Sequence, residues 1–293
     1  MLTYQSIQEL VQQAENSGQS VGRIVLLDQA EQMEQTPAAL EAEMGRRLAV
    51  MRQAAADGLA TGERSASGLS GGAAVRLLRA VEAGTAISGP LLSRMLARAL
   101  AVAEINARMG RIVAAPTAGS CGILPAVLLT LTDDHGCSEE QAIVSLFTAA
   151  GFGMVIANQA SVSGAEGGCQ AECGSAAAMA AAAAVELLGG TPAQAAHACA
   201  IALKNNLGLV CDPVAGLVEV PCIKRNAAGA AQALVAAELA LAGIESAIPV
   251  DEVIMAMKQV GAALPVSLKE TAAGGLAATP TALRAAAEMN GRE

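Results

Sequence analysis

Aromatic residues are nearly absent from this chain, which contains no Trp, one Tyr and two Phe among its 293 residues. The 53% of residues that are hydrophobic are therefore mostly Ala, Leu, Val, Ile and Met. Ala has the highest helix propensity of all residues. Because no segment shows the alternating pattern of a β-strand, we predict an all-α fold. We expect a compact bundle of Ala-rich helices with glycine-rich loops at the helix N-termini.

Positive charge is also scarce, since 18 Lys and Arg residues face 27 Asp and Glu residues and the net charge is −9. An acidic surface repels nucleic acids and anionic lipids, so we expect no nucleic-acid partner. The longest apolar run, "AAAMAAAAAVELLGG", is mostly Ala and shorter than the ~20 strongly apolar residues that cross a bilayer. The N-terminus lacks a basic head followed by an apolar run. We therefore expect a cytoplasmic protein without a membrane segment.

The chain shows one change of character along its length. Residues 1–62 are acidic helical segments and predict an N-terminal helical arm or subdomain. We expect residues 63–293 to form the main domain, although the two parts can also form one continuous domain. Within the first part, Thr36 as N-cap and Pro37 at the first helical position predict a helix that stops at Gly58.

Three glycine-rich loops each lead into a predicted helix: Ser67–Gly72, Thr117–Gly122 and Ser161–Gly168. Free N–H groups at helix N-termini bind anions, and glycine lets the backbone approach a ligand closely. A carboxylate or a phosphate would suit such loops. None has the spacing of a nucleotide-binding P-loop, and no strand precedes them as a dinucleotide site requires. The same glycines can equally serve only to start the helices.

The seven cysteines form an odd number in a chain without an export signal, which argues against a disulfide framework. Cys169 directly follows one glycine-rich loop, and Cys211 and Cys222 bracket the segment "CDPVAGLVEVPC" with its two prolines, Pro213 and Pro221. This spacing matches no zinc ribbon or ferredoxin pattern. Three thiolates from distant segments can hold a [4Fe–4S] cluster and leave one iron without a protein ligand. Each thiol taken alone can also be a small buried hydrophobe.

Several long segments resemble the α chain of the iron–sulfur-dependent bacterial L-serine dehydratases. They are "APTAGSCGILPAVL", "SVSGAEGGCQAECGSAAAMAAAA" and "KNNLGLVCDPVAGLVEVPCIKRN", and "RSASGLSGG" is similar to a substrate-side loop of that family. The resemblance runs from about Gly22 to Thr281. The chain length matches the two-subunit form, in which a separate β chain completes the enzyme. The chain departs from the family at Ala73, where members often carry Asp, and no cysteine follows Cys222 to cap the fourth iron.

The resemblance implies a reaction and a cofactor. L-Serine would be converted to pyruvate and ammonia, in amino-acid degradation that can feed gluconeogenesis, without pyridoxal phosphate. Cys169, Cys211 and Cys222 match the three cysteines that hold the [4Fe–4S] cluster in that family. The iron without a protein ligand would act as a Lewis acid on the serine hydroxyl.

The resemblance also implies substrate-binding residues. The loop Thr117–Ala118–Gly119–Ser120 is similar to the segment expected to hold the substrate carboxylate, and Ser65, Ser67 and Ser163 are further candidates for the same pocket. Histidines of the β chain are expected to contribute the base. Lys204 is the candidate base from this chain, provided that desolvation lowers its pKa.

Two alternatives stay open at this point. A related cluster-dependent enzyme could act on L-cysteine as a desulfidase. A helical scaffold could instead hold a structural metal and catalyse nothing. A structural site closes all metal positions, whereas a catalytic site leaves one open.

Overall fold

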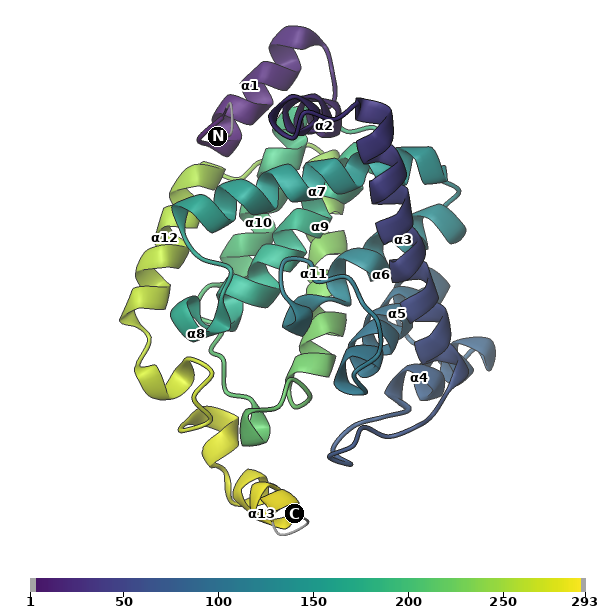
Figure 1. The fold of residues 1–293 in the computed structure, drawn as a ribbon, viewed down its shortest axis with the longest axis vertical. Helices are drawn as coiled ribbons and strands as arrows, with labels where there is room; N and C mark the ends of the chain where they lie inside the picture. The colour runs from purple at the N-terminus through teal and green to yellow at the C-terminus, as the bar shows by residue number, and fades with distance from the viewer. Residues whose placement is uncertain (1–3, 291–293) are drawn as a thin grey trace.

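The computed structural model describes residues 4–290 (Figure 1). This part of the chain forms thirteen α-helices and several shorter helical turns, and its only β pairings are two isolated bridges. The all-α prediction is therefore confirmed. The helices are α1 (Ile7–Ser17), α2 (Val21–Gln32), α3 (Pro37–Ala60), α4 (Ala73–Glu82), α5 (Gly89–Ala107), α6 (Ile123–Asp133), α7 (Glu139–Gln159), α8 (Gly164–Gly167), α9 (Ser175–Leu187), α10 (Pro192–Asn206), α11 (Cys222–Leu241), α12 (Val250–Ala263) and α13 (Pro280–Asn290).

Helix α9 lies at the centre of the molecule, surrounded by α6, α7, α10 and α11 (Figure 1). All of its residues except Glu186 are buried, and most of them are Ala. A helix that is apolar on every side is stable only inside a core. The Ala side chains leave room for four neighbouring helices, so the scarcity of large aromatic residues is compatible with dense packing.

Two of the surrounding helices start with reciprocal caps that the sequence encodes locally. Ser138 and Gln141 form a capping box at the start of α7, and Thr191 and Gln194 form another before α10. Each box satisfies N–H groups that have no partner within the helix. Pro192 occupies the first helical turn of α10, where a missing N–H has no cost.

The predicted stop of the third helix at Gly58 is wrong. Thr36 caps α3 and Pro37 opens it as expected, but the helix continues to Ala60. A Cβ atom on Gly58 would lie 2.4 Å from the carbonyl oxygen of Ala101 in α5. Glycine at this position therefore serves the close approach of α3 to α5.

The N-terminal helices share their core with the rest of the chain. Val25 of α2 and Leu48 of α3 belong to the same buried apolar core as α9, and α2 packs on α7. The carboxylate of Asp251 in α12 accepts hydrogen bonds from the N–H groups of Ile7 and Gln8, at 2.9 and 3.0 Å. Residues 4–62 are thus attached to the rest of the chain, and the boundary at residue 62 stays a prediction.

The three glycine-rich loops all lead into helical segments. Ser67–Gly72 precedes α4, and Thr117–Gly122 contains a short turn before α6. Ser161–Gly168 contains the single turn α8, and a π-helical turn, Gln170–Gly174, then joins it to α9. Turns of the π type are frequent at functional sites.

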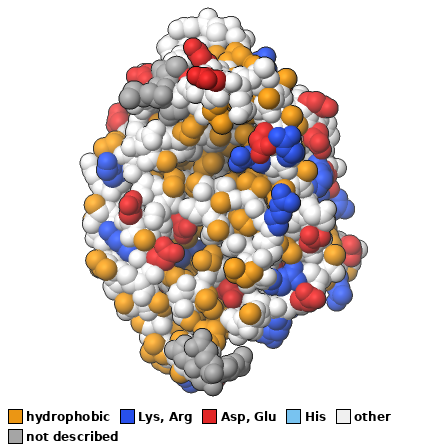
Figure 2. All heavy atoms as spheres, in the orientation of Figure 1, with side chains coloured by type: hydrophobic (Ala, Val, Ile, Leu, Met, Phe, Trp, Pro, Cys, Tyr) orange, Lys and Arg blue, Asp and Glu red, His pale blue; other side chains and the backbone are white. Residues whose placement is uncertain are grey.

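Charge is unevenly distributed over the face shown in Figure 2. Lys and Arg side chains are more frequent on the side of α3, where Arg46 and Arg47 pair with Glu43. The middle of the face carries mostly apolar and uncharged side chains. Helix α7 has the length and apolar composition of a membrane span, but 61% of its most apolar window is buried in the core. The core helix of a globular protein meets the same criterion.

We expect Gly58→Ala to destabilise the fold although Ala is the better helix former. The added methyl group collides with the backbone of α5, and such overpacking costs roughly 1–3 kcal/mol. Urea denaturation would measure the loss. Gly62→Ala is the matched control, because a Cβ there meets no atom within 4 Å. Equal stability of the two variants would contradict the close-packing role of Gly58.

Candidate active site

The three cysteines predicted as ligands come from three separate segments. Cys169 precedes the π-helical turn, Cys211 lies in the loop after α10, and Cys222 is the first residue of α11. All three are buried, with 2%, 3% and 8% of their surface exposed. Burial raises the pKa of Cys222 to about 12 and also raises that of Cys211, and the charge of Cys169 adds to both shifts. The thiols are therefore within electrostatic range of one another, while their role as ligands stays a prediction.

Cys169 has the most favourable environment for a thiolate. A hydrogen bond from the Cys173 thiol and the nearby guanidinium of Arg225 lower the pKa of Cys169, and the same hydrogen bond and burial raise the pKa of Cys173. Arg225 is held in place by two further contacts. It donates to the carbonyl of Val210 at 2.8 Å and to Asp212 at 2.9 Å. A fixed positive charge thus stands beside the first thiol.

The donor set fits an iron–sulfur cluster better than a single metal ion. Within residues 4–290, no three His, Cys, Asp or Glu side chains are arranged to hold one ion. In a cubane cluster each thiolate binds a different iron, so the ligands stand around the cluster and do not converge on a point. Soft thiolates are the ligands that such clusters use in proteins. Buried thiols on three segments, with a guanidinium beside one of them, meet these requirements.

The backbone of Cys211 is fixed by the C-terminal segment. Its N–H donates to the carbonyl of Leu268 at 2.9 Å, and its carbonyl accepts from the N–H of Glu270 at 2.8 Å. The side chain of the next residue, Asp212, accepts from the N–H of Leu276 at 2.7 Å. Residues 268–276 therefore form a strap that holds the second thiol in place.

Asn226 connects the predicted carboxylate loop to the third thiol. Its amide nitrogen donates to the carbonyls of Gly119 and Cys222, at 2.8 and 2.9 Å, and its amide oxygen accepts from the N–H of Gly122 at 2.8 Å. Asn226 is 1% exposed. The sequence analysis assigned no role to this residue. Nothing in the local pattern distinguishes it, because its partners Gly119 and Gly122 lie more than 100 residues away in the chain.

Glu172 lies between the loop and the second thiol. Its Oε1 accepts a hydrogen bond from Thr117 Oγ1 at 2.7 Å, and its Oε2 is 4.0 Å from Cys211 Sγ. Cβ atoms on Gly119 or Gly164 would lie 3.1 and 2.8 Å from this carboxylate. Burial raises the pKa of Glu172. The structure thus brings Thr117 and Gly119 of the predicted loop close to Cys211, one of the predicted ligands.

The other residues of the predicted loop differ in access. Ala118 is exposed, whereas Ser120 is fully buried and its hydroxyl faces the carbonyl of Ala115 at 3.3 Å. Ser163 precedes α8 and is half-buried. Of these three, only Ala118 and Ser163 are open to a ligand without a movement of the chain.

Ser65 and Ser67 bind a carboxylate of the chain itself. Their hydroxyls donate to Glu219 at 2.6 and 2.8 Å, and the Ser70 hydroxyl donates to the same group. A hydroxyl has a single proton to donate. A substrate carboxylate would therefore have to displace Glu219, and the substrate role of the two serines stays a prediction. Glu219 lies within "CDPVAGLVEVPC" and was overlooked as a partner.

Lys204, the candidate base, points elsewhere. Its Nζ donates to Ser246 Oγ at 2.8 Å, and the N–H of Ser246 donates to His197 Nδ1 at 3.2 Å. In the described part of the chain, no hydrogen bond joins Lys204 to the cysteines or to the glycine-rich loops. The structure does not bring this residue together with the rest of the site.

Residues 16–277 match the family model described as serine dehydratase alpha chain. The chain is similar to the probable L-serine dehydratase alpha chain of Bacillus subtilis, with 50% identity over 95% of this chain and 92% of the relative. It is also similar to the L-serine dehydratase alpha chain of Peptoniphilus asaccharolyticus, with 43% identity over 93% and 94%.

The chain belongs to the serine dehydratase alpha chain family. The resemblance predicted from the sequence is thereby confirmed. A longer relative, the L-serine dehydratase of Streptomyces coelicolor, is 50% identical over 61% of this chain but only 40% of its own length. The match to that protein thus covers only part of each chain.

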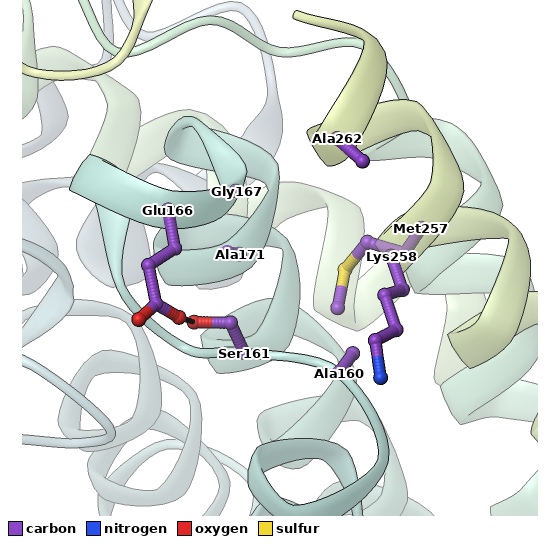
Figure 3. A pocket seen from close by; sticks show the side chains of 8 residues that line it. All are labelled: Ala160, Ser161, Glu166, Gly167, Ala171, Met257, Lys258 and Ala262. Atoms are coloured by element: carbon purple, nitrogen blue, oxygen red, sulfur yellow. Dashed lines mark hydrogen bonds between the residues drawn. The ribbon is translucent and has the colours of Figure 1, made fainter.

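Two cavities flank the cysteine segment of this alpha chain. One, of about 200 Å³, lies between α8 and α12 and is lined by Ser161, Glu166 and Lys258 among others (Figure 3). The Ser161 hydroxyl donates to Glu166 there at 2.6 Å. The other, of about 360 Å³, is bordered by Cys173 and Arg225. The second cavity is the one that reaches the neighbourhood of the predicted ligands.

We expect Asn226→Leu to destabilise the alpha chain strongly. The substitution keeps the side-chain volume similar but leaves the N–H of Gly122 and the carbonyl of Gly119 without their partner, at a cost of roughly 2–4 kcal/mol. Urea denaturation of the variant measures this loss. Asn205→Leu is the control, since Asn205 is exposed. A change below about 0.5 kcal/mol for Asn226→Leu would show that Asn226 does not hold the loop.

Proposed function

We propose that this chain is the α subunit of an L-serine dehydratase that converts L-serine to pyruvate and ammonia with a [4Fe–4S] cluster. The observation that carries the proposal is that Glu172 contacts both Thr117 and the buried thiol of Cys211, with the buried thiols of Cys169 and Cys222 within electrostatic range. The family and the names of the relatives support the reaction and the status as an alpha chain. A separate β chain is the partner.

The chain's own residues have distinct parts in this reaction. Cys169, Cys211 and Cys222 hold the cluster. When bound, a [4Fe–4S] cluster supplies a Lewis-acid iron for the substrate hydroxyl. Arg225, beside Cys169, offsets negative charge at the thiolates, and the loop Thr117–Ser120 orients the substrate carboxylate.

The reaction requires two bonds of serine to break. A base removes the Cα proton, and the Cβ hydroxyl leaves with a proton as water, which gives aminoacrylate. Hydrolysis of aminoacrylate then yields pyruvate and ammonia. Since Lys204 is bound to Ser246, we assign the base to the β chain. No pyridoxal phosphate takes part in this scheme.

A reducing compartment suits this chemistry. All seven cysteines are free thiols, and reduced thiols persist in the cytosol. We therefore place the protein in the cytoplasm, where serine degradation delivers pyruvate to central metabolism.

Iron and acid-labile sulfide measured after anaerobic reconstitution test the cluster. We expect about four of each per chain, and less than about one in Cys211→Ser, because serine replaces a thiolate ligand. Cys137→Ser is the matched control: Cys137 is only half-buried, lies near the carbonyl of Leu187, and should retain full loading. Full loading of Cys211→Ser would remove Cys211 from the ligand set. One zinc and no sulfide in the wild type would overturn the mechanism.

The isolated α chain should bind its cluster and yet turn over L-serine slowly. Loss of a general base typically costs about 10²–10⁴-fold in rate. Pyruvate formation by the α chain, with and without the β chain, measures this difference. L-Cysteine assayed in parallel separates the dehydratase from a desulfidase. Full activity of the α chain alone would place the base on this chain.

A further inference from the structure

Glu172 is a carboxylate that contacts both the predicted carboxylate loop and a predicted cluster ligand. Oε1 accepts from Thr117 Oγ1 at 2.7 Å, and Oε2 is 4.0 Å from Cys211 Sγ. Glu172 is half-buried, so a small molecule can reach it. Its position is set from two sides, by the loop and by the turn that starts after Cys169.

Glycines approach the Glu172 carboxylate closely on two sides. A Cβ atom on Gly164 would lie 2.8 Å from Oε2 and 3.0 Å from Cys211 Sγ, and one on Gly119 would lie 3.1 Å from Oε1. A side chain at Gly164 would have to displace the carboxylate, and one at Gly119 would press against it. The two glycines thus allow the carboxylate to keep its position between the loop and Cys211.

A serine molecule carries its carboxylate, ammonium and hydroxymethyl groups on one carbon atom. If the carboxylate lies at the Thr117 loop and the hydroxyl lies near the thiols, the ammonium group must lie between the two. Glu172 occupies that intermediate place. This reasoning depends on the function proposed above.

Among the described residues, no unpaired cation acts on Glu172. Among the described residues, Arg225 is the cation whose charge acts on Glu172, and Arg225 already pairs with Asp212 at 2.9 Å. The acidic Glu270 also acts on Glu172. A positive partner stabilises the charged form of a partly desolvated carboxylate. The ammonium group of an amino acid supplies that charge, and its N–H groups suit the unused lone pairs of Glu172.

We propose that Glu172 binds the ammonium group of the substrate and so selects amino acids over the corresponding hydroxy acids. Thr117 holds the carboxylate of Glu172 by its hydroxyl and aims it at the ligand. The residue acts on binding and takes no proton from the substrate.

The test compares L-serine with 3-hydroxypropionate, which lacks the ammonium group. The α–β complex with its cluster is prepared with wild-type α chain and with Glu172→Gln, which keeps the shape and removes the charge. We expect KM for L-serine to rise at least ~10-fold, which is the loss of one charge-assisted hydrogen bond. The inhibition constant of 3-hydroxypropionate should change less than ~3-fold.

Glu166→Gln is the matched control. Glu166 is an exposed glutamate of the same segment. Its carboxylate accepts a hydrogen bond from Ser161 at the cavity between α8 and α12 (Figure 3). Neither the KM for L-serine nor the inhibition constant of 3-hydroxypropionate should change in this variant. Iron and sulfide content, measured on every sample, reports whether the cluster is intact.

Other results would overturn the inference. An equal weakening of both ligands would make Glu172 a structural residue, and a fall in kcat at constant KM would make it an acid or base. Loss of the cluster from both Glu172→Gln and Glu172→Asp would assign it to cluster binding. Failure of the wild-type complex to act on L-serine would instead refute the proposed function, and the inference would fall with it.

Discussion

Buried backbone without regular structure must find hydrogen-bond partners away from water, and this constraint shapes the whole site. Cys211 and the predicted substrate loop lie on such backbone. Asn226 provides hydrogen-bond partners for backbone groups of the Thr117–Gly122 loop, and Asp212 provides one for the C-terminal strap. Gln170, fully buried, accepts from the N–H of Gly208 and donates to the carbonyl of Met257, both at 2.9 Å. These side chains fix loops that packing alone would leave free.

The helical core supplies the rigidity against which those loops are held. The Ala side chains of α9 pack against neighbouring helices on all sides. Its N-terminal end therefore cannot shift without disturbing these four helices. Glu172 lies at that end on the π-helical turn, and Cys169 directly precedes the turn. Cys222 begins α11, which packs directly on α9. Two of the three thiols are thus attached to the core, and the third, Cys211, depends on the strap.

The sequence predicted those features that local chemistry encodes. Ala content and caps such as Thr36 predicted the helices, and the motifs around Cys169 predicted the family, while the ligand role of the cysteines stays a prediction. Features that join distant segments were missed. Gly58 resembled a helix stop because its contact with Ala101 is invisible in the local pattern. The pairing of Ser65 with Glu219 likewise joins residues 154 positions apart, and no periodicity reports such a contact.

In the proposed function, the distribution of titratable groups is the reason for assigning the base to a second chain. The predicted site has thiols, carboxylates and one guanidinium, and the guanidinium is already paired with Asp212. Among the described residues, His197 and Lys204 both contact Ser246, between α11 and α12, and no hydrogen bond joins them to the predicted ligands. Arg stays protonated, the thiols are the predicted cluster ligands, and Glu172 is the proposed partner of the substrate ammonium group. Ala118, Ala165 and Gly216 are exposed residues of the predicted loops, which leaves these loops accessible to a partner. We therefore assign binding and metal ligation to this chain and proton transfer to the proposed partner chain.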